Sequence, residues 1–465
     1  MSSPQVIPYE GQALIGISRR EITPPIGIYG RMWGASSHDI SEGTHKPLYV
    51  TALSLQSSPA DMPALLVSVD AASIGDLSGL EAHWIRKEVM SALNIDDSHL
   101  MLACSHTHAS PWSAHSRSKM PGGDLIEGYL QNLLSAIIDA GREAILERAL
   151  AIVTCKSGSC SLATNRDFPD PYDPNRFLTG FNPAVPADET LMVGRIVTVQ
   201  DGKVIGTIVN YACHPTSLGW DNKLISPDYV GAMRERIENE FEGAPCLFLQ
   251  GASGDLAPAY QYAPDVSVAD SHGDQLGFAA LSVLASMNPS GQKLAFDRAV
   301  ESGAPLAYWI PKTYAVPTDV AITADKVNLP AKAWPSEAKL DREIEKATDS
   351  FAKERLFRKR SIAKLMSGKS EIELTIYGWR LGKILLVGVQ CEVYSVWQMT
   401  VREMFPDHAV VAITCVDYEA IGYVVPDALH ELNLYTAWQP PFGKGGMDAL
   451  FEGSVRQLKK TFNQA

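Results

Sequence analysis

The sequence has no excess of basic residues. Its 40 Lys and Arg are outnumbered by 53 Asp and Glu, which gives a formal net charge of −13. Proteins that bind nucleic acids carry a basic patch or stripe, and proteins drawn to anionic membranes carry clusters of Lys and Arg. We therefore expect no nucleic-acid partner and a small-molecule substrate.

Long hydrophobic runs are also missing. No apolar stretch approaches the roughly 18–20 residues that a membrane-spanning helix needs. Residues 1–16 contain no basic segment followed by a long apolar stretch, so no signal peptide is evident. We expect no membrane span and a cytoplasmic protein of bacterial type.

Cysteine is scarce and unpaired in sequence. The seven cysteines are odd in number, and none belongs to a C-x-x-C motif. Most lie within apolar runs, where free cysteine packs as a small hydrophobic residue, and this favours a reducing compartment. A Cys155–Cys160 disulfide is the alternative. Internal repeats and low-complexity tracts are absent as well.

The pattern that is present is an alternation of strands and helices. It predicts an α/β fold with a mixed β-sheet flanked by helices. The expected strands are 13–17, 48–55, 64–69, 100–104, 149–155, 192–199, 204–212, 245–249, 371–377, 383–389 and 408–416. The expected helices are 79–93, 124–146, 226–241 and 447–462, the third beginning at Ser226-Pro227-Asp228, with serine as cap and proline in the first turn.

A change in composition marks residues 336–367, which are rich in Lys, Arg, Glu and Ala. Because acidic residues are interspersed with the basic ones, we predict a solvated helical pair rather than a basic binding patch. We interpret residues 1–465 as one large domain with this charged helical insertion.

The most informative motif follows the apolar run at residues 100–104. His106 and His108 are separated by one residue. In an extended segment alternate side chains point the same way, so both imidazoles are expected to face one pocket. Neutral imidazole is a common zinc ligand, so this motif predicts half of a metal site.

Other predicted strands also end in side chains able to bind a metal. If these strands share one sheet, the groups converge beyond its carboxyl edge. A catalytic zinc ion is held by about three such groups and keeps one open position. These side chains are His214, Asp255, Glu392 and Tyr423.

Two simpler explanations stay open at this point. A histidine after a strand is commonly a hydrogen-bonded polar group, and His-x-His lacks the helical framework of H-E-x-x-H. Glu392 lies in an otherwise apolar stretch and needs a partner, but a salt bridge would satisfy it as well as a metal.

Six segments resemble, in the same order, motifs of the neutral/alkaline non-lysosomal ceramidase family. The family motifs are T-H-T-H-S-G-P, N-R-S-P, A-x-H-P-T-S, G-D-V-S-P-N, P-G-E and two tyrosines twelve residues apart. The matching segments here are 105–111, Asn165-Arg166, 210–217, 253–258, Gln390-Cys391-Glu392, and Tyr423 with Tyr435.

The resemblance implies a fold like the catalytic domain of neutral ceramidases and assigns roles to the matched residues. The implied zinc ligands are His106, His214, Glu392 and Tyr423. His108, Arg166 and Tyr435 would line the site and hold the substrate carbonyl and the oxyanion that develops from it.

One departure changes the expected mechanism. Ala257 stands where the family has its nucleophilic serine, so serine attack from that position is excluded. We expect attack by a zinc-bound water whose pKa is lowered toward ~7, with Asp255 or His108 accepting the proton. Ser253, four residues earlier, is the alternative nucleophile.

A second departure concerns domains. Full-length ceramidases of the family carry a C-terminal β-sandwich and are exported, whereas this sequence ends 30 residues after Tyr435. We expect the catalytic domain without the β-sandwich, acting inside the cell on something other than ceramide in a bilayer.

These observations favour a zinc-dependent hydrolase that cleaves an amide or ester bond of a small polar substrate. Arg166 would anchor a carboxylate or hydroxyl cluster, and Trp33 and Ser253 would contribute to substrate binding. A metal-dependent glycoside-cleaving or lyase-type enzyme is an alternative, because tryptophans near the motifs could stack on a sugar: Trp33, Trp112, Trp220 and Trp438. A non-catalytic metal- or ligand-binding homologue is another. The oligomeric state cannot be derived from the sequence.

Overall fold

The computed structural model describes residues 4–77, 79–366, 368–417 and 421–463. Its largest element is an eight-stranded mixed sheet, in which only the β5–β6 and β12–β14 pairs are parallel. In spatial order its strands are β14 (Cys246–Gln250), β12 (Val204–Tyr211), β11 (Thr190–Thr198), β7 (Ala149–Ser159), β2 (Tyr9–Glu21), β4 (Tyr49–Gln56), β5 (Ala64–Val69) and β6 (Leu100–Cys104). The expected strands 192–199 and 204–212 form an antiparallel hairpin as β11 and β12, and Gly202 in its turn has φ +71°.

A second, four-stranded sheet packs against the first. Its strands, in spatial order, are β18 (Val320–Pro330), β19 (Glu371–Leu381), β20 (Ile384–Val389) and β22 (Ala409–Ile413). Met101 and Leu249 of the large sheet share one buried apolar cluster with Trp379 and Leu386 of the small one. The sequence predicted the strands but not their division between two sheets.

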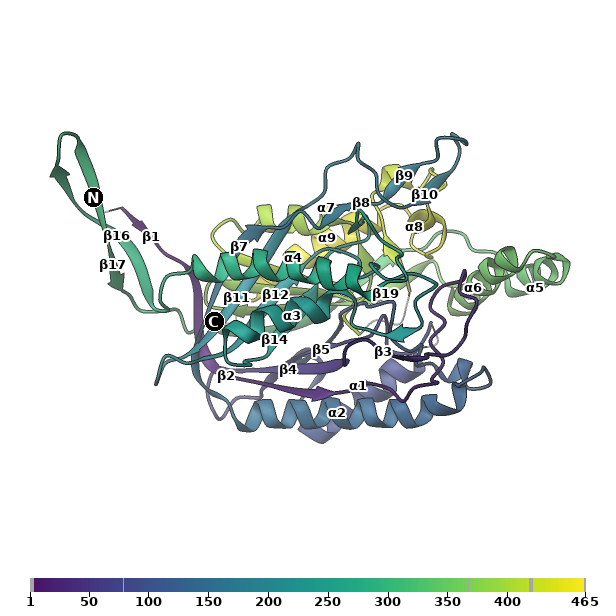
Figure 1. The fold of residues 1–465 in the computed structure, drawn as a ribbon, viewed down its shortest axis with the longest axis horizontal. Helices are drawn as coiled ribbons and strands as arrows, with labels where there is room; N and C mark the ends of the chain where they lie inside the picture. The colour runs from purple at the N-terminus through teal and green to yellow at the C-terminus, as the bar shows by residue number, and fades with distance from the viewer. Residues whose placement is uncertain (1–3, 78, 367, 418–420, 464–465) are drawn as a thin grey trace.

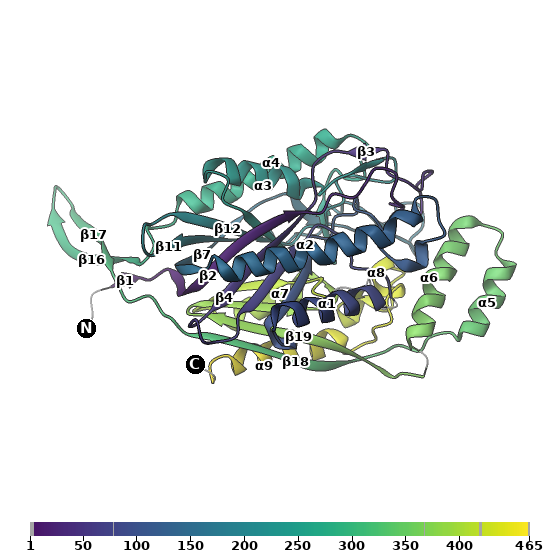
Figure 2. The same cartoon turned by 90° about the horizontal axis from the view of Figure 1, so that it is seen from below.

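Helices cover the outer faces of the two sheets (Figures 1 and 2). They are α1 (Leu80–Leu93), α2 (Ile126–Leu146), α3 (Tyr229–Glu240) and α4 (Val266–Ala285) on the large sheet, and α7 (Ser395–Glu403) and α9 (Gly446–Lys460) on the small one. Helix α2 approaches β2 so closely that a Cβ at Gly16 would lie 1.9 Å from the Ala144 carbonyl oxygen. The predicted α/β fold with a helix-flanked mixed sheet is therefore confirmed, although α4 and α7 were not predicted.

Helix α3 begins later than expected. Asp228, not Ser226, caps it, with φ +54° and a carboxylate that accepts the Tyr229 N–H. Ser226 is used elsewhere: its N–H donates to Ala109 O, and its carbonyl accepts from Thr107 Oγ1 at 2.7 Å. These bonds hold the segment before the helix against the His106–His108 turn, and the helix starts only after them.

Short elements surround the carboxyl ends of the main strands. The paired ones are β3 (Gly43–Thr44) with β13 (Leu224–Ile225), β8 (Ala163–Asn165) with β15 (Leu256–Pro258), β9 (Asp167–Pro169) with β10 (Phe177–Thr179), and β21 (Glu392–Val393) with β23 (Tyr423–Val424). The short helices are α8 (Tyr435–Trp438) and 3₁₀ turns at Asp97–His99, His115–Arg117, Gly123–Leu125 and Asp427–Leu429.

Two projections leave the core at opposite ends (Figure 1). One is a hairpin of β16 (Gln292–Glu301) and β17 (Pro305–Thr313), extended by β1 (Gln5–Val6). The other is the predicted charged helical pair, α5 (Glu337–Lys346) and α6 (Ser350–Met366), whose last predicted residue, 367, lies outside the described residues. Helix α6 is not fully solvated, because Ile362 and Met366 are buried in the core. That 336–367 is an insertion stays a prediction.

The large sheet curls until its edge strands approach each other. Neighbouring strands in a sheet are rotated by about 20–25°, so eight strands turn well past a right angle. Ser68 of β5 accordingly donates to the Phe248 carbonyl of β14 at 2.6 Å. The segment after β22 joins both edges, since the Thr414 N–H donates to Gln250 O and Cys415 O accepts the Cys104 N–H. The loops after β6, β12, β14 and β20 therefore meet.

All seven cysteines are buried and free, so the Cys155–Cys160 disulfide does not form. Among the described residues, every helix falls short of the length or the apolar character needed to cross a bilayer.

Candidate metal and catalytic site

His106 lies just beyond β6 in a left-handed backbone conformation, with φ +68°. Its N–H donates to Ala71 O at 2.8 Å, and its ring Nδ1 lies 2.8 Å from Ala72 O. The extended alternation expected for His106 and His108 is therefore wrong, because β6 ends at Cys104. The two rings nevertheless meet edge to face, with centroids 5.0 Å apart.

His214 is held in the same way. It follows β12, and its Nδ1 lies 2.7 Å from the Ser253 carbonyl oxygen. Its Nε2 lies 3.0 Å from Glu392 Oε2, and His106 Nε2 lies 3.2 Å from the same oxygen. Three chain segments far apart in the sequence thus bring two imidazoles and a carboxylate together.

The hydrogen-bonding pattern fixes the character of these atoms. A carbonyl only accepts, so each Nδ1 carries a proton, and the neutral form of each ring presents a lone pair at Nε2. A carboxylate oxygen is also an acceptor. A proton or a cation can be shared between such atoms.

Burial and neighbouring charges act on all three groups. Burial, with Arg166 next in size, lowers the pKa of His214 to about 3. Burial alone would lower the pKa of His106, but Cys415 and Glu392 outweigh it and raise this pKa well above the usual value. Burial alone would raise the pKa of Glu392, but His106 and His214 outweigh it and hold this pKa well below normal. The cluster is thus tuned to an ionised carboxylate beside a neutral His214.

His108 belongs to the same cluster. Ring nitrogens of His106, His108 and His214 lie within 4.8 Å of one another. His108 Nε2 is buried and has no hydrogen-bond partner among the described residues. Burial, followed by the charges of the other two histidines, lowers its pKa well below normal. The geometry therefore admits His108 either as a ligand or as a neutral base.

Arg166 and Tyr423 border the cluster. The buried Arg166 guanidinium donates through Nε and Nη2 to the Gly254 carbonyl, at 3.0 and 2.8 Å, and lies 5.5 Å from the Tyr423 ring. Tyr423 is opposite Glu392 in the β21–β23 pair and stacks on His214 at 6.2 Å. Tyr435 follows, 5.8 Å from Tyr423, so these predicted residues are brought together.

Two predicted residues lie elsewhere. Both carboxylate oxygens of Asp255 bind Ser395, at 2.7 Å from its N–H and 2.8 Å from its Oγ, at the start of α7. Burial raises the Asp255 pKa to about 6. Ser253 Oγ accepts from Gln250 Nε2 and lies 3.1 Å from His214 Nδ1, on the side of the imidazole away from Glu392. These positions argue against Asp255 as proton acceptor and against Ser253 as nucleophile or substrate ligand.

The predicted tryptophans divide into two groups. Trp33 lies 5.0 Å from the His108 ring and belongs to an aromatic group with Trp220 and Tyr262. Trp112 stacks with Arg117, and Trp438 with Arg355. Trp33 thus borders the cluster on the His108 side and Trp220 contacts Trp33; that Trp33 binds substrate stays a prediction.

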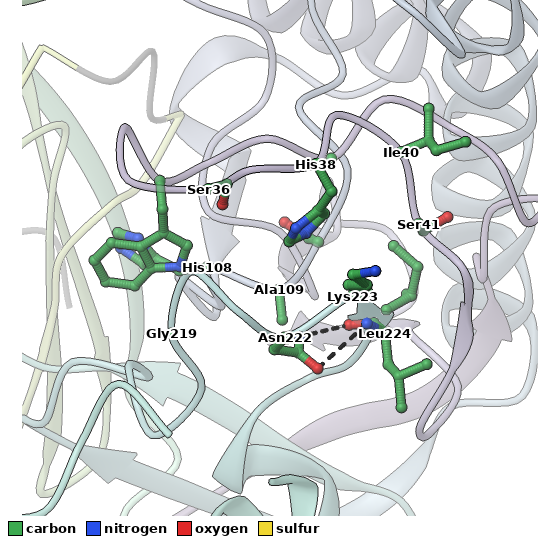
Figure 3. A pocket seen from close by; sticks show the side chains of 14 residues that line it. Ser36, His38, Ile40, Ser41, His108, Ala109, Gly219, Asn222, Lys223 and Leu224 are labelled. Carbon is green, nitrogen blue, oxygen red and sulfur yellow. Dashed lines mark hydrogen bonds between the residues drawn. The ribbon is translucent and has the colours of Figure 1, made fainter. Parts of the chain in front are cut away.

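A pocket opens beside His108, and the sequence did not single out two residues near it. His38 extends into this pocket, as Figure 3 shows, and its Nδ1 is buried without a hydrogen-bond partner among the described residues. Tyr262, beside Trp33, has φ +63°. Tyr262 could have been identified from its position shortly after the 253–258 motif. His38 could not, because its loop contains no recognisable motif.

The family model described as "Neutral/alkaline non-lysosomal ceramidase, N-terminal" matches residues 13–264, more than half of the chain. The chain belongs to this family. Glu392 and Tyr423 lie beyond the matched residues, and the fold alone brings them to the ceramidase-family histidines.

Individual ceramidases agree with this assignment. The neutral ceramidase of Pseudomonas aeruginosa is 24% identical over 263 residues, which are 54% of this chain but only 37% of the relative. A solved ceramidase complexed with C2 superposes with a TM-score of 0.65 at 14% identity, covering 99% of this chain and 76% of the other. The crystal structure of the P. aeruginosa neutral ceramidase gives 0.65 at 15% identity, covering 98% and 75%. The predicted ceramidase-like fold is confirmed.

Proposed function

We propose that this ceramidase-family protein is a zinc-dependent hydrolase that cleaves an amide bond. The observation that carries the proposal is the convergence of His106 Nε2 and His214 Nε2 on one oxygen of Glu392. Family membership supports amide hydrolysis as the reaction class.

The donor set fits zinc. Two imidazole nitrogens and a carboxylate oxygen are usual zinc ligands, and backbone carbonyls that fix each imidazole are the usual outer partners. Tyr423, opposite Glu392, would be the fourth ligand. When bound, zinc would supply Lewis-acid chemistry, polarising a carbonyl oxygen and making water a stronger nucleophile at neutral pH.

The remaining steps fall to the chain's own groups. In hydrolysis, the water oxygen bonds to the carbonyl carbon, the C–N bond breaks and the amine leaves with a proton. His108 Nε2 is neutral and without a protein partner, so we assign it the proton from water and its delivery to the amine. Arg166 and Tyr435 would hold the carbonyl oxygen as negative charge develops on it.

Water is the proposed nucleophile because Ala257 has no hydroxyl and the Ser253 hydroxyl does not face the cluster. Ala257 is completely buried in β15 and has no hydroxyl. Ser253 Oγ faces the far side of His214. We therefore assign the attack to a water molecule.

Metal analysis with a panel of variants tests this proposal. The purified protein should contain about one zinc per chain, and His106→Ala and His214→Ala should lose both zinc and turnover of N-acyl amines. His108→Ala should keep zinc and lose turnover. His99→Ala, at a partly exposed surface histidine paired with Asp96, is the matched control and should behave as wild type.

Three results would overturn parts of the proposal. Zinc loss in His108→Ala would make His108 a ligand rather than the base. Wild-type protein that holds zinc but cleaves no N-acyl amine or ester would be a non-catalytic homologue. Turnover of aryl glycosides alone would favour the sugar alternative. Most glycosidases use two carboxylates, whereas Glu392 is the one carboxylate that contacts the histidines of the cluster among the described residues.

A further inference from the structure

A row of aromatic rings leads away from the histidine cluster. Tyr423 stacks on His214, Tyr435 lies 5.8 Å from Tyr423, and Trp438 lies 5.5 Å from Tyr435. Tyr435 and Trp438 are the two ends of the short helix α8. In both overall views α8 lies beside α6 of the charged helical pair (Figures 1 and 2).

Helix α6 presents cations to this row. The Arg355 guanidinium carbon lies 4.0 Å from the centre of the Trp438 ring, and Lys359 Nζ lies 5.6 Å from the same ring. Arg358 interacts with the Tyr435 side chain. Positions 355, 358 and 359 share one helix face because they are three or four residues apart.

A fourth cation comes from the strand side. Lys332 Nζ donates to the Ala437 carbonyl of α8 at 2.6 Å and lies 5.2 Å from the Trp334 ring. Burial, followed by the charge of Lys359, lowers the Lys332 pKa to about 8. The two ammonium groups therefore repel each other at close range.

Three of these cations have no carboxylate partner among the described residues. Within the described ranges, neither Arg355, Lys359 nor Lys332 forms an ion pair with a carboxylate. Arg360, on the same helix, does pair with Asp341 of α5. In a chain of net charge −13, a local cluster of cations without carboxylate partners attracts anions.

The surroundings leave room for such an anion. Lys332 lines a cavity of about 530 Å³ together with Trp334, Ser336, Lys369 and the carboxylate residue Glu337. Arg355 and Lys359 are outside this lining and face the Trp438 ring. Guanidinium groups bind carboxylate and phosphate oxygens through paired hydrogen bonds, and the adjoining rings provide apolar surface for a linker.

We propose that Arg355, Lys359 and Lys332 form an anion subsite, and that the substrate is an N-acyl compound carrying a carboxylate, sulfonate or phosphate group. The substrate class rests on the proposed hydrolase function at the histidine cluster. The anionic group binds at α6 while the amide bond lies at the cluster, and the tyrosine row contacts the portion between them.

Steady-state kinetics with four matched amides, whose twelve-carbon spacer is long enough to follow the tyrosine row, tests the subsite: the N-octanoyl derivatives of 12-aminododecanol, 12-aminododecanoic acid and 12-aminododecanesulfonic acid, and the O-phosphate of the first. Wild type should show a KM at least tenfold lower for one or more anionic compounds than for the neutral one. The double variant Arg355→Gln/Lys359→Gln should raise that KM at least tenfold and leave kcat and the neutral substrate within twofold. Arg360→Gln, on the face paired with α5, is the control and should change neither.

Calorimetric titration of the same anionic compounds separates this proposal from the proposed function. If no amide is cleaved but the double variant loses anion binding that wild type and Arg360→Gln retain, the subsite stands and the hydrolase proposal fails. If amides are cleaved but the double variant treats neutral and anionic compounds as wild type does, the hydrolase stands and the subsite is wrong. Equal binding by wild type and the double variant also overturns the subsite.

Discussion

The two halves of the candidate site differ in how their polar groups are satisfied. In the histidine half, each Nδ1 is occupied by a carbonyl while the Nε2 atoms face Glu392 and one another. In the loop after β14, Ser253 and Asp255 are hydrogen-bonded within the protein and Ala257 is apolar. Three imidazoles and a carboxylate gathered at one place could hold a cation. The loop half supports the imidazoles and needs nothing added.

The largest expected effect comes from removing the group that both imidazoles share. Glu392→Gln keeps the shape but removes the negative charge, so zinc affinity should fall by more than the roughly 10–100-fold that loss of an outer partner costs. Zinc content after dialysis and N-acyl amine turnover measure this. If Glu392→Gln kept its full zinc content, Glu392 would not be a ligand, and the contrast between the histidine half and the loop half would be wrong.

Arg166 links the halves, since it is anchored on Gly254 and faces Tyr423. Arg166→Ala should retain zinc and lower kcat by about 10²–10³-fold, the usual cost of losing one donor to a developing oxyanion. Loss of zinc instead would assign Arg166 to ligand support, because its removal would then release the ligand Tyr423.

Asp255 tests whether the loop half is structural. Burial raises its pKa to about 6, so the folded protein binds this proton more tightly than the unfolded chain does. The resulting stability is fully present below about pH 4, the unfolded value, and is lost as the pH rises through about 6, roughly 3 kcal/mol at most. Asp255→Asn should flatten the dependence of the unfolding free energy on pH in this window.

Urea denaturation between pH 4 and 7 measures that slope. Asp221→Asn, at an exposed aspartate, is the control and should keep the wild-type slope. An Asp255→Asn protein with unchanged slope but abolished turnover would return Asp255 to the chemistry.

The smallest effect is expected at Ser253. Ser253→Ala removes one acceptor of Gln250 Nε2, which still donates to Cys213 O, so stability should fall by about 1 kcal/mol and turnover should stay within a few-fold. Abolished turnover with intact zinc would instead make Ser253 the nucleophile.

Much of the fold could be predicted from residue patterns. Alternating and continuous apolar runs located the sheet strands, and the expected helix 124–146 is α2, which buries Ile126, Leu130, Leu133 and Ile137 at helical spacing. Helix α7 was missed because it begins three residues after Glu392 within an apolar stretch that continues a strand pattern. Helix α4 was missed because small residues such as Ala269, Gly273 and Ala280 form its buried face.

The candidate site was predicted less completely, for a physical reason. His106, His214 and Glu392 were identified from side-chain chemistry and the family resemblance. The atoms that orient them are carbonyl oxygens of Ala72 and Ser253, and any residue type carries a carbonyl. The charge on α6 was visible in the sequence, but its position against α8 depends on tertiary packing.

The segment after β22, which contains Thr414 and Cys415, joins parts of the chain that are far apart in sequence. Cys415 contacts His106 across 309 positions of sequence, and Glu392 reaches His214 across 178. Contacts this distant are made late, because closing long loops is slow and entropically costly. The histidine cluster therefore requires segments from both halves of the chain, and a metal bound there would mark the completion of folding.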